Sequence, residues 1–492
     1  MATSRRGFMQ GVVGGALVLG LDLRTRSWVT HAVADAGIAG LPRLDGELRT
    51  AGLAPFAADF GRIVSHPPRA VLVPGSVEDI VKIVGFARRH GLRVAANGQA
   101  GTDDLRESHS NLGQSQVEAG IAIDMSPLDA MHAVDDHHAD VGAGAHWSAV
   151  FDAAAAHGAT PPVFTDYVHL SVGGTLSVGG IGGTSQHFGV QVDNVDELDV
   201  VTGRGERVVC SRASHRELFE AVLAGAGQCA IIVRAKLRLV RAAPQARVFL
   251  LFYDDLDAYL ADQLALLRDR RFSYLEGQVV RRADDSGWRF MIEAASYFTP
   301  PRVPDDAALL AGLRDHRPEA QITTQSDRDF IFRLDPTVAL LKSIGVWQLP
   351  HPWITLFLPA AATGAYVSNV LSTLTPADTG QGPILLYPFD PAKLTRPLFR
   401  APAAPAAFQF SILRTAAPAT SAVIAAMLAG NRRLYDDAVA VGGVRYAIGA
   451  IPDFTPHDWR RHFGGAWDFL ARSKQRFDPD RILTPGQGMF AA

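Results

Sequence analysis

One stretch of the sequence joins six glycines to a single acid. It reads TDYVHLSVGGTLSVGGIGG over residues 165–183, and Asp166 stands near its start. Glycine permits close backbone approach, so the pairs at 173–174, 179–180 and 182–183 could expose several amide N–H groups on one curved surface. Such a surface suits an anionic or flat ligand. A carboxylate at its edge is a candidate proton acceptor, although an isolated aspartate is usually just solvated.

The pattern by itself leaves a structural interpretation open. A glycine-rich turn set between strands would look the same. The stretch lacks the G-K-[ST] of a Walker loop, and no long βαβ unit surrounds it as in a Rossmann fingerprint. Ligand surface and structural turn therefore both remain at this point.

Composition indicates a globular protein of two or three domains. The chain has 492 residues, of which 48% are hydrophobic and 20% charged, with a formal net charge of −3. No block of like charge indicates binding to nucleic acid or a membrane surface. Cys210 and Cys229 lie in apolar, strand-like contexts, which predicts buried thiols rather than a disulfide scaffold. No C-x-x-C or His/Cys cluster indicates a metal site.

The N-terminus has the layout of an export signal. Arg5 and Arg6 precede an apolar run over residues 11–21, and the AVA at 32–34 is a candidate cleavage site. The run is too short to span a bilayer. We expect residues 1–34 to be a twin-arginine signal peptide and the protein to be secreted or periplasmic, without a stable membrane anchor. The alternative is a cytoplasmic protein with a basic start.

The elements that must position the glycine stretch belong to an α+β domain. HPPRAVLVPGSVEDIVKIVGFARRHGLRVAANGQ predicts a strand, a helix and a strand. Ser76 can cap the helix, Ile80, Val81 and Val84 share one face, and Gly91 ends it. Further strands follow, and the GRG of NVDELDVVTGRGERVVC predicts a hairpin.

A second set of predicted strands and helices begins near residue 244. ARVFLLFYDDLDAYLADQLALL predicts a strand and an amphipathic helix, and SYLEGQVV, HPWITLFLP, PILLYPF and FQFSILRT predict further strands. The C-terminal helix stops before Asp478, and a glycine-bearing turn follows. We find no internal repeat.

Taken in order, these motifs resemble the flavin-binding domain of the vanillyl-alcohol-oxidase (PCMH-type) superfamily, and within it the cytokinin dehydrogenases. FTDYVHLSVGGTLSVGGIGG, NVDELDVVTG and GAGQCAIIVRA are similar to family motifs in the first half. In the second half, HPWITLFLP, GPILLYP, SYLEG, HFGGAW and FDPDRILTPGQGMF have close counterparts. Because the motifs are long and occur in the same order, chance does not explain them.

The resemblance implies an α+β fold with two domains: a split FAD-binding domain and a substrate-binding domain whose antiparallel sheet is flanked by helices. We place the FAD-binding domain at 35–243, the substrate domain at 244–445, and a C-terminal segment that returns to the first domain at 446–492. The implied cofactor is FAD. The residues expected to bind it are His109, Ser110, Gln114, Asp166, Ser171, Ser177, Ile181, Ile232, Thr484 and Gln487.

In the family, a histidine in R-G-x-G-H-S-x-x-G-Q is bonded to the flavin 8α-methyl group. The segment SHSNLGQ places that histidine at His109, and the residues after it fit without a gap. A second alignment puts NGQAGT on the same motif, with Gly101 at the histidine position and a non-covalent flavin. We favour His109, and the loop that precedes it leaves the alternative open.

The resemblance also implies the chemistry. Asp166 would accept the proton of the substrate's N6-amine while the neighbouring C–H leaves as hydride, giving an imine that hydrolyses to an adenine and an aldehyde. On the substrate side the implied residues are Glu276, Trp353, Thr355 and Ile451.

Two of these positions depart from the family pattern. Thr355 replaces an Asn, and Ala450–Ile451 replaces an aromatic–Leu pair. The expected function is therefore that of an exported cytokinin dehydrogenase acting on isopentenyladenine-type substrates, with quinone or O2 as electron acceptor. The alternatives are a flavin oxidase of the same fold that acts on another amine, alcohol or sugar, and a flavoprotein that binds a ligand or passes electrons without turnover.

Overall fold

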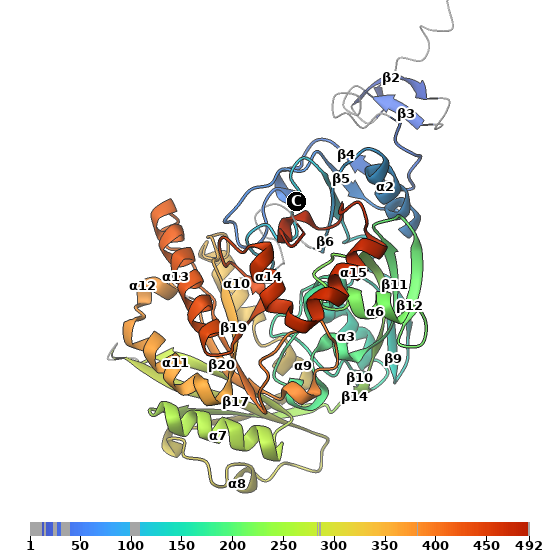
Figure 1. The fold of residues 1–492 in the computed structure, drawn as a ribbon. Helices are drawn as coiled ribbons and strands as arrows, with labels where there is room; N and C mark the ends of the chain where they lie inside the picture. Colours follow the sequence, from blue (N-terminus) through green and yellow to red (C-terminus); the bar gives the residue numbers. More distant parts are fainter. Residues whose placement is uncertain are drawn as a thin grey trace, which may run out of the picture.

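A computed structural model describes residues 12–13, 16–22, 27–30, 40–98, 109–282, 284, 287–380 and 382–490 (Figure 1). The arginine pair at 5–6, the AVA at 32–34 and Gly101 lie outside these ranges. Within the expected leader, three short strands pair in sequence order: β1 (Val12–Val13), β2 (Ala16–Asp22) and β3 (Ser27–Thr30). Among the described residues, no helix combines the length and the apolarity needed to cross a bilayer.

The fold begins with a small sheet whose core is parallel. Its order is β4-β5-β7-β6, with bounds Glu47–Arg49, Ala70–Val73, Ile121–Asp124 and Val94–Asn97. Helix α2 (Val77–Arg89) connects β5 to β6 and buries Ile80, Ile83 and Val84 against the sheet. This spacing is one face of a helix, which confirms Ile80 and Val84, while Ile83 is buried and Val81, predicted for this face, is only partly buried.

Ser76 precedes α2 but does not cap it with its side chain. Its hydroxyl donates instead to the carboxylate of Asp45 at 2.7 Å. The carboxylate of Asp79 accepts the N–H groups of Gly75 and Gly46 at 3.0 and 2.7 Å. An acid in the first helical turn therefore ties the neighbouring loops to the helix start, which corrects the role predicted for Ser76.

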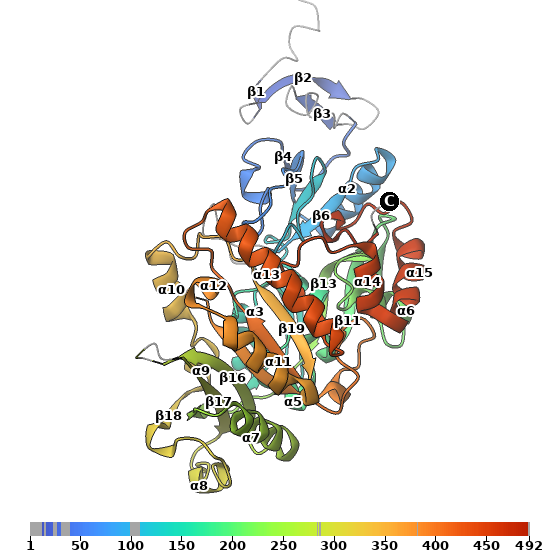
Figure 2. The same cartoon turned by 60° about the vertical axis from the view of Figure 1, so that its left-hand side comes forward.

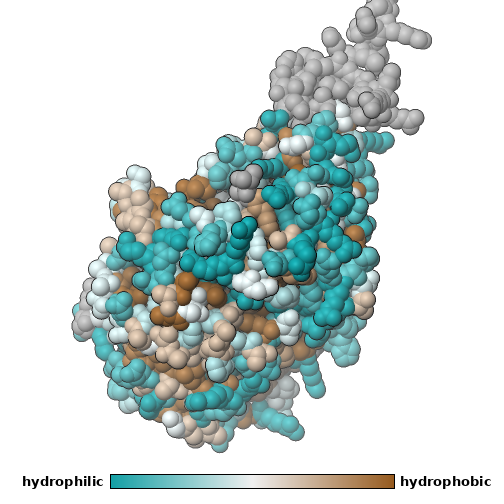
Figure 3. All heavy atoms as spheres, in the orientation of Figure 1, coloured by the Kyte–Doolittle hydropathy of each residue, from teal (hydrophilic) through white to brown (hydrophobic). Residues whose placement is uncertain are grey.

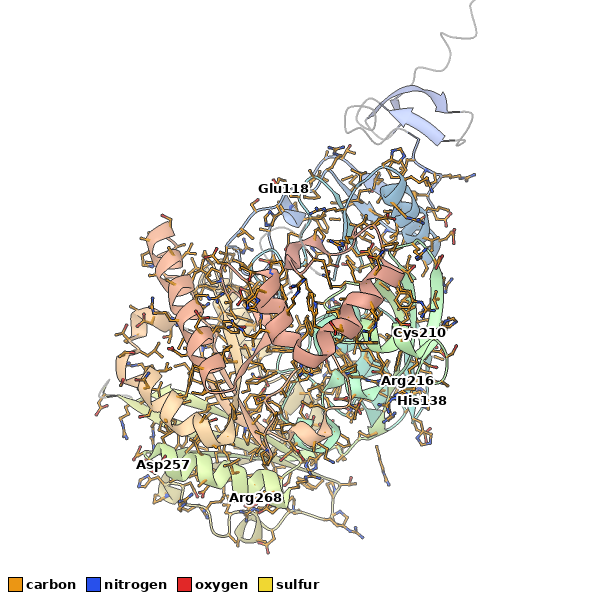
Figure 4. All side chains as sticks on the ribbon, viewed as in Figure 1. Glu118, His138, Cys210, Arg216, Asp257 and Arg268 are labelled. Carbon is orange, nitrogen blue, oxygen red and sulfur yellow. The ribbon has the colours of Figure 1, made fainter. Side chains whose placement is uncertain are left out.

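A five-stranded antiparallel sheet completes the first domain. Its order is β12-β11-β13-β9-β8, with bounds Arg207–Ser211, Val195–Thr202, Ala230–Arg238, His138–Gly142 and Met131–Val134. The predicted hairpin joins β11 to β12. Helices α3 (Trp147–Ala155) and α6 (Arg216–Val222) also belong to this domain. Cys210, labelled in Figure 4, and Cys229 are buried free thiols, as predicted.

The glycine stretch forms a short helix, α4 (Val172–Val178), that lies beside β13. Ser171 caps it, since its side-chain oxygen accepts the N–H of Gly174 at 3.3 Å. Val172 donates its own N–H to the carbonyl of Ala145 at 2.8 Å, which anchors the helix start to the loop after β9.

The second domain is an eight-stranded antiparallel sheet. Its order is β18-β15-β17-β16-β20-β21-β19-β22, with bounds Gln321–Ser326, Gln245–Tyr253, Trp288–Phe298, Tyr274–Arg281, Ile384–Phe389, Ala407–Ile412, Ile354–Pro359 and Val444–Gly449. Figures 1 and 2 show three helices along it, namely α7 (Leu256–Asp269), α11 (Ala360–Thr373) and α13 (Ser421–Ala440). This confirms the predicted antiparallel sheet flanked by helices.

Residues at both ends of helix α7 stabilise it. Asp255 caps it by accepting the N–H of Ala258 at 2.7 Å. Asp257 lies in the first turn and Arg268 in the last, where each charge opposes the helix dipole. Figure 4 places both side chains on the outer side of the molecule. Over the same face in Figure 3, hydrophilic residues predominate on the first domain, and hydrophobic ones are scattered over the second.

After β22 the polypeptide lies against the first domain. Helix α14 (Pro456–Phe463) is followed by α15 (Trp467–Phe477), which contacts α6. The buried ammonium group of Lys474 donates to the carbonyl of Gln228 and to Asp478 at 2.8 and 2.7 Å. A bridge between Val94 and Leu483 then joins the last segment to the first sheet.

Candidate active site

A cavity in the first domain collects most of the predicted cofactor residues. Its walls come from β6, the loop at 109–115, helix α4, the start of β13 and the C-terminal turn. Eight of the ten predicted residues line it: His109, Ser110, Gln114, Ser171, Ser177, Ile232, Thr484 and Gln487. Ile181 is buried outside this lining, and Asp166 lines a second cavity.

Most glycine N–H groups of this stretch find acceptors within the protein, which differs from the prediction. The N–H of Gly173 donates to the carbonyl of Ala143 at 2.8 Å, and that of Gly180 to the hydroxyl of Tyr446 at 2.9 Å. These amides are therefore used within the protein and are not presented to a ligand. The N–H groups of Gly174, Gly179 and Gly182 also find acceptors within the protein, so for five of the six glycines the structure favours the structural interpretation over an amide-donating surface.

What the glycines provide is close approach. Of the three pairs, only 173–174 lines the first cavity. A Cβ at Gly182 would lie 1.8 Å from the carbonyl oxygen of Phe164, and one at Gly183 would lie 2.4 Å from the ring of Tyr274. The later glycines thus let the stretch pack against its own start and against the second domain.

His109 lies where the first cavity meets the second domain. Its ring stacks on Tyr167 with centroids 5.2 Å apart and meets the edge of Trp353 at 4.8 Å. Burial, with a smaller contribution from His351, lowers the pKa of His109 to about 3, and the charge of Asp166 opposes that shift. His109 is therefore a neutral imidazole near neutral pH, the form that acts as a nucleophile.

Two residues of the first cavity have buried polar atoms that find no hydrogen-bond partner within the described part of the protein. The atoms are the amide nitrogen of Asn97 and the amide oxygen of Gln487. A buried polar group without a hydrogen bond is unfavourable by about 1–3 kcal/mol. One donor and one acceptor in the walls of an otherwise largely apolar cavity fit a large cofactor that carries both kinds of group.

Asp166 lies in an ionic cluster at the boundary between the domains. Its carboxylate accepts a hydrogen bond from Arg333 at 2.7 Å and one from the hydroxyl of Tyr274 at 3.2 Å. Burial raises the pKa of Glu276 well above its usual range, and the charge of Asp166 adds to the shift while Arg333 opposes it. Asp166 is therefore held by residues of the second domain, although it belongs to the first.

Strand register places two of the predicted substrate residues on one face of the large sheet. Thr355 of β19 pairs with Ser411, and Ser411 pairs with Leu385 of β20. Leu385 pairs with Gln278 of β16, two residues beyond Glu276. Because residues two apart on a strand share a face, Glu276 and Thr355 lie on the same side.

Trp353 reaches the cavity edge by its contact with His109. Ile451 does not join this group. It is 2% exposed and belongs to the apolar core of the second domain, which includes Ile354 and Leu356. The structure therefore brings Glu276, Trp353 and Thr355 to the side of the site and assigns Ile451 to packing.

Comparisons with known proteins cover both domains. Residues 68–211 match a family model described as an FAD binding domain, and residues 284–490 match one described as cytokinin dehydrogenase 1, FAD and cytokinin binding. Cytokinin dehydrogenase 4 of Oryza sativa subsp. japonica is 33% identical over 493 residues, which cover 92% of this protein and 91% of the relative. The chain belongs to the cytokinin dehydrogenase family.

Two further relatives show the spread of this family. An uncharacterised oxidoreductase, ORF5 in the fasciation locus of Rhodococcoides fascians, is 41% identical over 434 residues, which cover 88% of this protein and 96% of the relative. Cytokinin dehydrogenase 2 of Arabidopsis thaliana is 32% identical over 466 residues, which cover 88% and 91%.

Membership of the cytokinin dehydrogenase family confirms the predicted fold, cofactor and enzyme class. The protein is an FAD-dependent oxidoreductase acting on CH–NH groups. FAD, when bound, supplies the two-electron oxidant that takes a hydride from the substrate carbon. The first cavity fits FAD. The eight expected cofactor residues that line this cavity would hold FAD, together with Asn97.

Sequence reasoning missed three residues of the ionic cluster around Asp166: Arg333, Tyr274 and Glu293. Arg333 interrupts the apolar run FIFRL, and Glu293 interrupts FMIEAA. A single charge inside a short apolar segment is a signal of a buried ion pair, because an unpaired buried charge is strongly unfavourable. The nitrogen Nε of Arg333 indeed donates to Glu293 at 3.0 Å.

Proposed function

We propose that the protein oxidises the N6 side-chain amine of isopentenyladenine-type cytokinins to an imine, which water hydrolyses to adenine and an aldehyde. The observation that carries this proposal is the place of Asp166. Its carboxylate stands at the domain boundary among Arg333, Tyr274 and Glu276, and its charge acts on His109 at the cavity edge.

Each residue near the domain boundary has a separate role in the proposed reaction. Asp166 accepts the amine proton, which frees the nitrogen lone pair as the neighbouring C–H bond loses its hydride. Trp353 supports a planar purine as an aromatic wall beside His109. Glu276 and Thr355 supply polar contacts from the sheet. The electrons pass finally to quinone or O2.

Anaerobic mixing with isopentenyladenine tests this proposal. The oxidised-flavin absorbance should bleach in one turnover, with release of adenine and an aldehyde. Adenine is the matched control, because its amine bears no substituent with a neighbouring C–H bond, and it should leave the flavin oxidised. An unbleached flavin with isopentenyladenine would contradict the proposed substrate.

A second candidate is an oxidation of another amine, an alcohol or a sugar by the same cluster. Thr355 in place of the family's Asn favours it, and so does the burial of Ile451 in the core. The change at Thr355 falls on the same face of the sheet as Glu276, and neither change alters Asp166. Bleaching by one of these other substrates, with none by isopentenyladenine, would select this candidate.

We further propose export in a folded, flavin-loaded state by the twin-arginine route. The support is the SRRGFM sequence followed by a short apolar run. Replacing both arginines (Arg5→Lys with Arg6→Lys) should retain the precursor inside the cell, because this route reads the pair. Immunoblots of cell and external fractions measure the effect, with Arg24→Lys as the control of equal charge. Normal export of the double variant would reject this route.

A further inference from the structure

Arg333 is the centre of the ionic cluster around Asp166. One terminal nitrogen, Nη2, donates to Asp166 at 2.7 Å and also to the hydroxyl of Tyr274. Its Nε donates to Glu293 at 3.0 Å. The guanidinium lies 4.8 Å from the ring centroid of Phe330 and is itself mostly buried, with 17% of the side chain exposed. Each of these contacts fixes its orientation.

Three carboxyl groups share this single cation. Asp166 and Glu293 each receive a direct charge-assisted hydrogen bond from Arg333. Glu276 is only within 3.9 Å of the guanidinium, and its Oε1 is buried and has no hydrogen-bond partner among the residues that the structure describes. Glu276 and Glu293 are buried, and 25% of the Asp166 side chain is exposed. Because one positive charge cannot balance three negative charges in a cluster with so little solvent, we expect at least one carboxyl group to carry a proton.

The other groups packed around the cluster add no positive charge. They are Tyr274, Tyr297 and Tyr387, whose pKa values burial raises, and Asp327, whose pKa burial raises to about 6. In the described part of the protein, Arg333 is the one cation whose charge acts on both Glu276 and Glu293. The charge balance of the cluster therefore depends on this residue.

We propose that Arg333 is a positioning residue of the active site, which pairs with Asp166 and Glu293 and thereby leaves Glu276 as the uncharged carboxylic acid. Asp166 is then held as the proton acceptor, and Glu276 is a neutral donor beside it. The protonation pattern stands independently of the substrate, whereas its catalytic consequence rests on the proposed amine oxidation.

Infrared spectroscopy of the substrate-free holoenzyme tests the protonation pattern. Near pH 9, where Asp59 is ionised although burial raises its pKa to about 7, the wild type should show the C=O band of a protonated carboxylic acid, and Glu276→Gln should remove it. In Arg333→Gln a second such band should appear, because a buried carboxylate that loses its cation takes up a proton. Arg247→Gln is the matched control: Arg247 pairs with Asp306 at 3.0 Å in the same domain, and its loss should change neither band.

Kinetics separate positioning from a purely structural role. Arg333→Gln should move the acidic limb of the pH–rate profile for flavin reduction to higher pH, because the carboxylate base then keeps its proton to higher pH, and it should slow reduction at neutral pH. Arg333→Lys keeps the charge but not the planar fork. It should keep a single infrared band and reduce flavin about tenfold more slowly, the effect of about 1.4 kcal/mol.

The lysine variant carries the test if the glutamine variant does not accumulate as folded holoenzyme. A Glu276→Gln variant that retains the wild-type band overturns the proposal. So does an Arg333→Gln variant with the wild-type band and pH profile, or an Arg333→Lys variant with wild-type rate. A flavin that isopentenyladenine fails to reduce leaves the infrared result intact and rejects only the proposed substrate.

Discussion

Asp166→Asn is expected to slow flavin reduction by at least ~10²-fold, the usual effect of removing a general base. The amide keeps the size of the side chain and one oxygen for the bond from Arg333. It cannot accept the amine proton. Flavin content should stay at the wild-type level, because Asp166 does not line the cavity that fits FAD. The measurement is the anaerobic reduction rate per bound flavin.

Asp335→Asn is the matched control for that experiment. Asp335 also pairs across the domain boundary, with His169 at 3.0 Å, and the chemical change is the same. Its variant should reduce flavin at close to the wild-type rate. A role of Asp166 in packing alone predicts a different outcome, in which flavin content and thermal stability fall together. Full flavin content with near-normal reduction in Asp166→Asn would rule out the base assignment.

His109→Ala is expected to convert a covalent flavin into one that is released completely on acid denaturation. The imidazole lines the cavity, and its pKa of about 3 keeps it neutral and nucleophilic. After precipitation in acid, the yellow colour should stay with the wild-type polypeptide and should move to the supernatant for the variant. The ratio of the two absorbances is the measurement.

His351→Ala provides the neighbouring control. Its ring stacks on Phe60 at 4.4 Å, and both of its nitrogens are engaged, with the carbonyl of Trp347 at 3.1 Å and the hydroxyl of Thr415 at 3.3 Å. The flavin should remain attached in this variant. Release of all colour from the wild type would instead support the alignment that places Gly101 at the attachment position.

The sequence by itself determined the local elements and the family. Helix α2 follows from a 3.6-residue apolar period, and β19 follows from the short apolar run ITLFLP, which is buried along most of its length. Both are properties of neighbouring residues. The long ordered motifs identified the FAD-binding and substrate domains, and eight of the ten cofactor residues expected from them meet in one cavity. Such motifs correspond to backbone segments of the family fold. Their residues therefore lie around one cavity when the protein folds.

Only the tertiary structure decided which charged groups form ion pairs and which residues face the site. Asp166 and Arg333 are 167 residues apart, so no local period connects them. The amides of the glycine stretch looked available in sequence, yet Tyr446 and Ala143 bind them in the fold. Ile451 lies just after β22 and belongs to the apolar core of the second domain. Ion pairing and burial depend on distances across the domain boundary, and packing sets those distances.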